Sequence, residues 1–62
     1  MENKRIWYSI EMSKTKAEAF KEWLRENNIR YEPSECFNLI HFECYMDQDE
    51  LTRANDWIYF AN

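Results

Sequence analysis

The chain contains no glycine in its 62 residues. Phosphate-binding loops, and the sharp turn that presents a catalytic serine, depend on glycine where the backbone must approach a ligand closely or adopt a strained conformation. The sequence therefore excludes these glycine-dependent nucleotide sites and the serine-hydrolase turn. There is also a single histidine, His41, so few groups are available for general-base catalysis.

Cysteine is scarce as well, with only Cys36 and Cys44 in the chain. Two cysteines are fewer than a disulfide-stapled secreted domain of this size carries, so we expect both thiols to be reduced. A zinc site built from Cys36, His41 and an acidic residue is the alternative. We predict no metal, no cofactor and no enzymatic activity, because His41 is the only conventional base for either thiol and a short chain offers no deep cleft.

No apolar run approaches the roughly 20 residues that cross a bilayer, and the first residues lack the apolar region of a signal peptide. We therefore expect a cytoplasmic protein. Acidic residues outnumber basic ones by 12 to 8, giving a net charge of −4. This balance disfavours direct binding to a phosphate backbone. An acidic surface that occupies a groove built for nucleic acid stays open as an alternative.

What the chain has is apolar and aromatic content, at 45% and 18% of its residues. That content predicts a folded protein, and the absence of a linker, repeat or low-complexity stretch predicts one domain over residues 1–62. A chain this short buries only about 60% of the surface that its unfolded form exposes, so we expect marginal stability.

Alternating side chains predict a first strand from Arg5 to Met12. Ser13 then has the residue type and position of a helix N-cap, with Thr15 and Glu18 as an alternative capping box one step later. The helix is expected to run through "KTKAEAFKEWLRENN" and to stop at Asn28 in a left-handed conformation. The strand's core face is expected to hold Ile6, Tyr8, Ile10 and Met12, and its other face Arg5, Trp7, Ser9 and Glu11.

A second, short strand is predicted from Ile29 to Glu32, ended by Pro33, with "PSECFN" as a turn or irregular connection. A third strand is expected from about Asn38 to Met46. Its core face is predicted to hold Ile40, Phe42, Cys44 and Met46.

A second helix is expected to begin at the pattern formed by Asp47 and Glu50, a D-x-x-E variant of the capping box. Its end allows two interpretations. A helix that continues places Ile58 in the core and Phe60 on the far side, and this is the one we favour. The alternative is a helix that stops at Asn55 and a fourth strand from Trp57 to Ala61.

The element order is β-α-β-β-α, an α+β two-layer sandwich with sheet order 2-3-1 and both helices on one face. This topology resembles a ferredoxin-like fold that lacks its last strand, a likeness that does not assign function. The first strand is then a sheet edge, which can accept a strand from another molecule.

More aromatic side chains are present than a small core can enclose, so several are expected in contacts with a partner. For the tail, the C-terminal residues Trp57, Tyr59 and Phe60, the alternative is that Trp57 closes the edge of the core while the other two fray. On the uncovered sheet face, cross-strand pairing of Trp7 and Tyr45 is the structural alternative. The predicted partner-binding residues are Trp7, Leu39, His41, Tyr45, Trp57, Tyr59 and Phe60.

A cluster of acids is predicted to steer the chain toward a basic partner. Helix-dipole complementation is a structural explanation for the three acids at the start of the second helix, but it leaves Glu43 and Asp56 without one. The set comprises Glu43, Asp47, Asp49, Glu50 and Asp56.

In size, acidity and lack of a catalytic motif, the whole chain resembles the small accessory inhibitors of phages and mobile elements, of the anti-CRISPR and anti-restriction type. The resemblance implies a stoichiometric inhibitor of a host defence protein, such as a CRISPR effector, and a location in the host cell cytoplasm if a phage encodes the chain. We therefore expect a protein-binding inhibitor that occludes a partner's surface. The alternative is a homodimeric structural or regulatory module in which self-association consumes the aromatic face and the edge of the first strand.

Overall fold

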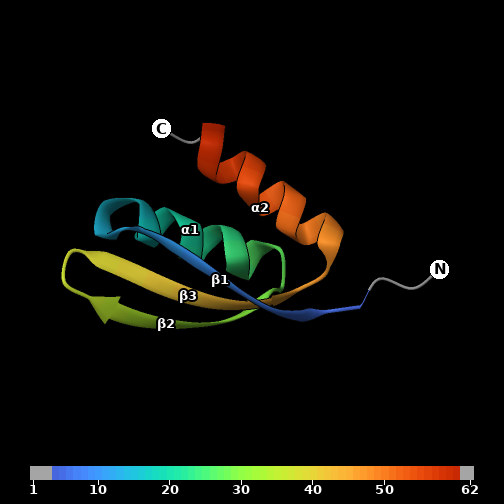
Figure 1. The fold of residues 1–62 in the computed structure, drawn as a ribbon. Helices are drawn as coiled ribbons and strands as arrows, with labels where there is room; N and C mark the ends of the chain where they lie inside the picture. Colours follow the sequence, from blue (N-terminus) through green and yellow to red (C-terminus); the bar gives the residue numbers. More distant parts are fainter. Residues whose placement is uncertain (1–3, 61–62) are drawn as a thin grey trace.

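One antiparallel sheet with both helices on the same side forms the fold (Figure 1). The structure is a computed structural model and describes residues 4–60. The order of elements confirms the β-α-β-β-α prediction. The elements are β1 (Ile6–Ser13), α1 (Lys14–Glu26), β2 (Arg30–Cys36), β3 (Leu39–Met46) and α2 (Gln48–Phe60).

The central strand of the sheet is β3, which pairs antiparallel with β1 on one side and with β2 on the other. The order β1-β3-β2 confirms the predicted order 2-3-1. Within residues 4–60, β1 and β2 are therefore the two edges of the sheet.

Local signals set both ends of α1. The hydroxyl of Ser13 accepts a hydrogen bond from the Lys16 N–H at 3.5 Å, which confirms the predicted N-cap. At the other end Asn28 has φ 56°, the left-handed conformation expected of it. The N–H of Ile29 donates to the Leu24 carbonyl at 2.9 Å, as in a Schellman motif, so carbonyls of the last turn keep partners.

The prediction for β2 was wrong at its end. The strand does not stop at Pro33 but continues to Cys36, and only Phe37 and Asn38 make the turn to β3. Proline lacks the N–H that a ladder uses, yet an edge strand tolerates it where that position faces away from the neighbouring strand. Pro33 lies opposite Phe42 on this outer strand.

The capping box at the start of α2 is confirmed. The Asp47 carboxylate accepts the Glu50 N–H at 2.8 Å, and the Glu50 carboxylate accepts the Asp47 N–H at 3.0 Å. The helix continues to Phe60, so the alternative of a fourth strand from Trp57 is wrong as far as residue 60. Ala61, the last residue of that alternative, lies outside the described residues.

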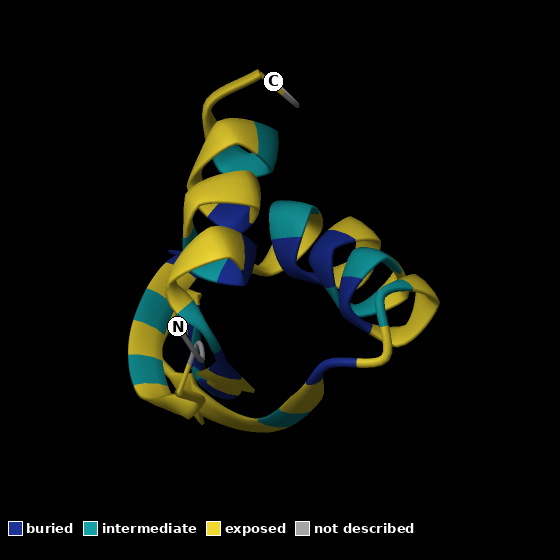
Figure 2. Ribbon diagram, turned by 90° about the vertical axis from the view of Figure 1, so that its right-hand side faces the viewer, coloured by how far each residue is buried: buried dark blue, intermediate teal, exposed yellow. Residues whose placement is uncertain are grey.

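The core fills the space between the sheet and the two helices, where the inward surfaces of the elements carry the buried residues (Figure 2). Phe20 of α1 is fully buried, and its ring lies 5.3 Å from that of Phe42 on β3 and 5.4 Å from that of Trp57 on α2. The Lys16 ammonium donates to the carbonyl of Ile58 and so links α1 to the last turn of α2. The predicted core face of β3 is confirmed by the burial of Ile40, Phe42, Cys44 and Met46.

Candidate functional site

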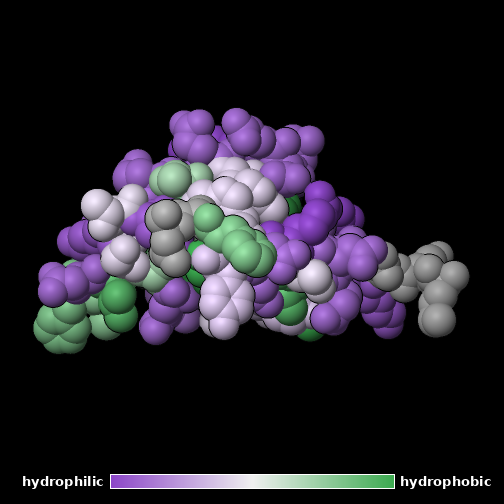
Figure 3. Space-filling model, turned by 90° about the horizontal axis from the view of Figure 1, so that it is seen from above, coloured by the Kyte–Doolittle hydropathy of each residue, from purple (hydrophilic) through white to green (hydrophobic). Residues whose placement is uncertain are grey.

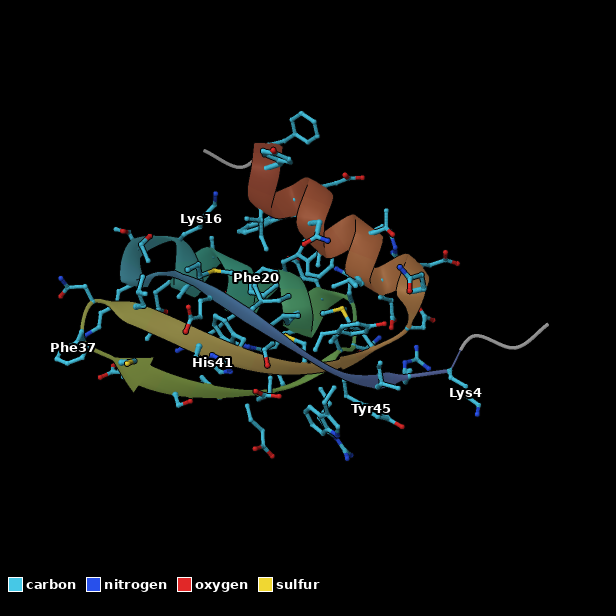
Figure 4. The ribbon with its side chains drawn as sticks, viewed as in Figure 1. Lys4, Lys16, Phe20, Phe37, His41 and Tyr45 are labelled. Carbon is cyan, nitrogen blue, oxygen red and sulfur yellow. The ribbon has the colours of Figure 1, made fainter. Side chains whose placement is uncertain are left out.

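The candidate site is the face of the sheet turned away from the helices, which we call the open sheet face. Figure 4 shows Tyr45 pointing from this side of the sheet, opposite to α1 and α2. The strand register arranges the face in four rows of one residue each from β1, β3 and β2. The rows are Trp7, Tyr45 and Arg30; Ser9, Glu43 and Glu32; Glu11, His41 and Ser34; and Ser13, Leu39 and Cys36.

The first row carries an aromatic pair, Trp7 and Tyr45, beside Arg30. The rings of Trp7 and Tyr45 lie 5.2 Å apart at an interplanar angle of 44°. Trp7 is 45% exposed and Tyr45 is 37% exposed, so each ring keeps a large free surface beyond the contact between them. Such paired, exposed rings are the residue types that anchor protein interfaces.

The two middle rows hold an acidic cluster around His41. Its Nε2 lies 2.7 Å from the Glu43 carboxylate and its Nδ1 lies 3.4 Å from the Glu11 carboxylate. The Ser9 hydroxyl donates to Glu43 at 2.8 Å. The hydrogen bond to Glu43, and then the one to Glu11, raise the pKa of His41, while His41 and then Ser9 lower the pKa of Glu43.

This cluster holds its carboxylates on two different sides of the imidazole ring, so the groups do not converge on one point. Within residues 4–60, no three His, Cys, Asp or Glu side chains are grouped as metal ligands. What the arrangement can do is present negative charge. The four rows contain three glutamates, Glu11, Glu32 and Glu43, and one permanent cation, Arg30.

The last row holds the exposed apolar side chain of Leu39 and continues into the turn between β2 and β3. Leu39 is 42% exposed, and Phe37 in the turn is 93% exposed with φ 58°. Figure 3, seen from the helix side, shows hydrophobic atoms gathered at this end of the molecule. The sequence interpretation missed Phe37. The available signal was an aromatic residue beside Asn38, at a turn where asparagine or glycine is the favoured residue.

The tail residues do not join this site. Trp57 packs against Phe20 at 5.4 Å and Trp23 at 6.5 Å, so it closes the edge of the core. Tyr59 and Phe60 are 78% and 84% exposed, but they belong to α2 on the other side of the sheet. Of the predicted partner-binding residues, the structure brings together Trp7, Leu39, His41 and Tyr45 only.

The five predicted steering acids are also separated. Glu43 lies on the open sheet face, whereas Asp47 and Glu50 cap α2. Glu50 is only 7% exposed and forms an ion pair with Arg5 at 3.0 Å, which gives it a structural role. Asp49 and Asp56 are exposed positions on α2.

Comparison with known proteins gave no match to a family model, a curated protein or a solved structure. No helix within residues 4–60 has the length and apolarity needed to cross a membrane.

Proposed function

We propose that this chain is a small inhibitor that binds a basic protein through its open sheet face and so occludes that protein's surface. The observation that carries the proposal is the exposed Trp7 and Tyr45 pair, placed one row from Glu43 and Glu32. One surface thus carries both the aromatic rings that contribute binding affinity and the carboxylates that favour a basic partner.

The aromatic pair supports the proposal because folding does not require it. A cross-strand pair on a solvated face contributes about 0.2–1 kcal/mol, much less than a buried aromatic side chain. Phe20, by contrast, contacts three other rings and is fully buried. The exposed surfaces of the Trp7 and Tyr45 rings can be buried against a partner.

The carboxylates of the two middle rows favour a positively charged partner. Carboxylates across an interface increase the rate of association with a positively charged surface and disfavour acidic partners. A site that normally holds phosphates has the matching charge. We therefore propose a nucleic-acid-processing host defence protein, such as a CRISPR effector, as the class of target.

The test is capture of proteins from a host lysate at low and moderate salt, with three forms of the chain as bait. We expect wild type to retain a basic nucleic-acid-processing protein, in equal molar amount, and to release it as salt rises. The double variant Trp7→Ala, Tyr45→Ala should lose this protein. Phe60→Ala, which removes a still more exposed ring from α2, is the control and should keep it. Capture that is unchanged in the double variant contradicts the proposal.

A further inference from the structure

The two edges of the sheet are protected to different degrees. Strand β2 has Pro33 near its middle and three charged residues, Arg30, Glu32 and Glu35, which are features that block the addition of another strand. Strand β1 runs for eight residues with no proline and with Glu11 as its one charged residue. The β1 edge is therefore the one able to accept a strand.

The side chains that β1 turns toward the helices are also incompletely covered. Ile6 is 50% exposed, and Tyr8 and Ile10 are only partly buried although both pack against the core. Their counterparts on the central strand, Phe42, Cys44 and Met46, are fully buried. A further strand beside β1 would cover this apolar row.

We propose that the occupant of this edge is a second copy of the chain, paired antiparallel through β1 with its two-fold axis at Tyr8. Residues that pair directly must lie on the same face of the sheet, so the axis has to pass through a residue rather than between two. About Tyr8, Ile6 of one copy faces Ile10 of the other. The apolar rows of the two copies thus become continuous.

Charge selects this register over its neighbours. An axis at Tyr8 places Glu11 of the second copy beside Lys4 and Arg5, and the same contact occurs twice by symmetry. The Arg5 side chain is half exposed and uses two of its nitrogens on Glu50, and Glu11 also lies 3.4 Å from His41, so the contact between copies adds to these pairs. An axis at Ser9 would instead place Glu11 opposite Trp7 and leave Arg5 opposite Ser13. The basic and acidic ends of the β1 segment are therefore complementary only about Tyr8.

The dimer also enlarges the surface of the proposed inhibitor. The open sheet face of one chain extends over about 20 Å along the strands and about 10 Å across them, less than the roughly 800 Å² that each side of a typical interface buries. In the dimer the two faces join, with Trp7 next to Ser9 of the second copy. This use of the dimer rests on the proposed function, whereas the dimer itself rests on the β1 edge.

The first experiment measures the mass of the full chain in solution by sedimentation over a range of concentrations. We expect a dimer of twice the 7.8 kDa chain mass. Tyr8→Lys places two ammonium groups at the axis and should raise the dissociation constant about tenfold or more. Tyr31→Lys is the matched control, because Tyr31 is also partly buried and pairs with Cys44 from the other edge. It should stay dimeric, with circular dichroism confirming that both variants fold.

The register has its own test in a Cys36→Ser, Cys44→Ala background, because Cys44 lies opposite both Tyr8 and Tyr31 and would otherwise offer each new thiol a partner within the chain. Residues opposite each other at an antiparallel two-fold axis are close enough for a disulfide. Tyr8→Cys should therefore form a covalent dimer on air oxidation, and Tyr31→Cys should not. A covalent dimer formed equally by both variants overturns the register.

The inference as a whole is overturned by a single-chain mass at millimolar concentration, or by equal loss of the dimer in Tyr8→Lys and Tyr31→Lys. These outcomes are separate from failure of the proposed function. A monomer whose capture of a basic protein still depends on Trp7 and Tyr45 contradicts only the dimer. A dimer that captures nothing contradicts only the inhibitor.

Discussion

His41 lies with its Nε2 2.7 Å from the Glu43 carboxylate, in the middle of the open sheet face. The other ring nitrogen faces Glu11 of β1 at 3.4 Å, so one imidazole connects carboxylates on two strands. Protonation makes both ring nitrogens donors and adds a positive charge between the two acids. The net charge of the candidate interface therefore depends on the state of this one ring.

The first prediction concerns the pKa of His41. We expect it above the ordinary value of 6.5, chiefly because of the hydrogen bond to Glu43 and secondarily because of Glu11. Titration of the imidazole by NMR measures it directly. Glu43→Gln should lower the pKa more than Glu11→Gln does, and Glu18→Gln on α1 should leave it unchanged. A reversed order would mean that Glu11 is the stronger partner.

The same contact predicts how stability depends on pH. The raised pKa of His41 stabilises the fold fully below 6.5 and loses its effect as pH rises through the folded-state value. The lowered pKa of Glu43 stabilises the fold above 4.5 and loses its effect as pH falls through the folded-state value. Both contributions are present between pH 4.5 and 6.5. Comparing denaturation of wild type and His41→Asn across this range should show the largest difference inside it.

Much of the fold follows from short-range patterns in the sequence. Alternation in residues 6–12, the Ser13 hydroxyl, the left-handed Asn28 and the pair Asp47 and Glu50 each act within a few residues, so the sequence alone determines their outcome. The extent of β2 could not be predicted in this way. Whether a strand tolerates Pro33 depends on whether a neighbour lies beyond it, which is a property of the whole sheet.

The candidate site was predictable only in part for the same reason. Strand parity correctly grouped Trp7, Tyr45 and His41, because side chains on paired strands share a face. Helical spacing correctly placed Ile58 against the core and Phe60 on the far side. It did not decide whether Trp57 packs in the core or contacts a partner, and in the structure Trp57 is a core contact. It also gave no reason to connect Glu50 with Arg5, which are 45 positions apart.

A third prediction follows from the contact between Glu50 and Arg5. Glu50 accepts the Asp47 N–H and two hydrogen bonds from Arg5 while almost fully buried. Glu50→Ala should lower the free energy of unfolding by about 1–3 kcal/mol, because it removes three part-buried hydrogen bonds, two of them to a charged group, and leaves the Asp47 N–H without its acceptor. Chemical denaturation measures the loss. Glu50→Gln should lose less, and Asp56→Ala, an exposed acid in the same helix, should change stability by no more than about 0.5 kcal/mol.

The fourth prediction distinguishes the two thiols. Cys44 is fully buried between the sheet and the helices, and burial raises its pKa to about 11, whereas Cys36 is exposed. A thiol reagent at neutral pH should therefore modify Cys36 at once and Cys44 only when the chain opens. Intact-mass spectrometry over time counts the labels. Rapid addition of two labels to the native protein would contradict the burial of Cys44.

The last prediction concerns Phe37, whose φ of 58° is costly for an aromatic residue and whose side chain is 93% exposed. Folding gains nothing from the ring and is opposed by the backbone conformation. Phe37→Asn should therefore raise the free energy of unfolding by about 1 kcal/mol, since asparagine tolerates the left-handed region. Thermal denaturation should show a midpoint about 4–8 °C higher for a domain of this size. Phe60→Asn, an exposed aromatic in a helix, is the control and should not stabilise the chain.

If Phe37 belongs to the binding surface, the same substitution should weaken capture of the partner while stabilising the free chain. Opposite effects on stability and binding identify a residue selected for contact with another molecule, because a residue kept for folding changes both in the same direction. A destabilised Phe37→Asn would show that the ring packs within the chain. A stabilised variant with unchanged capture would place the contact elsewhere on the open sheet face, with Trp7 and Tyr45 as its anchors.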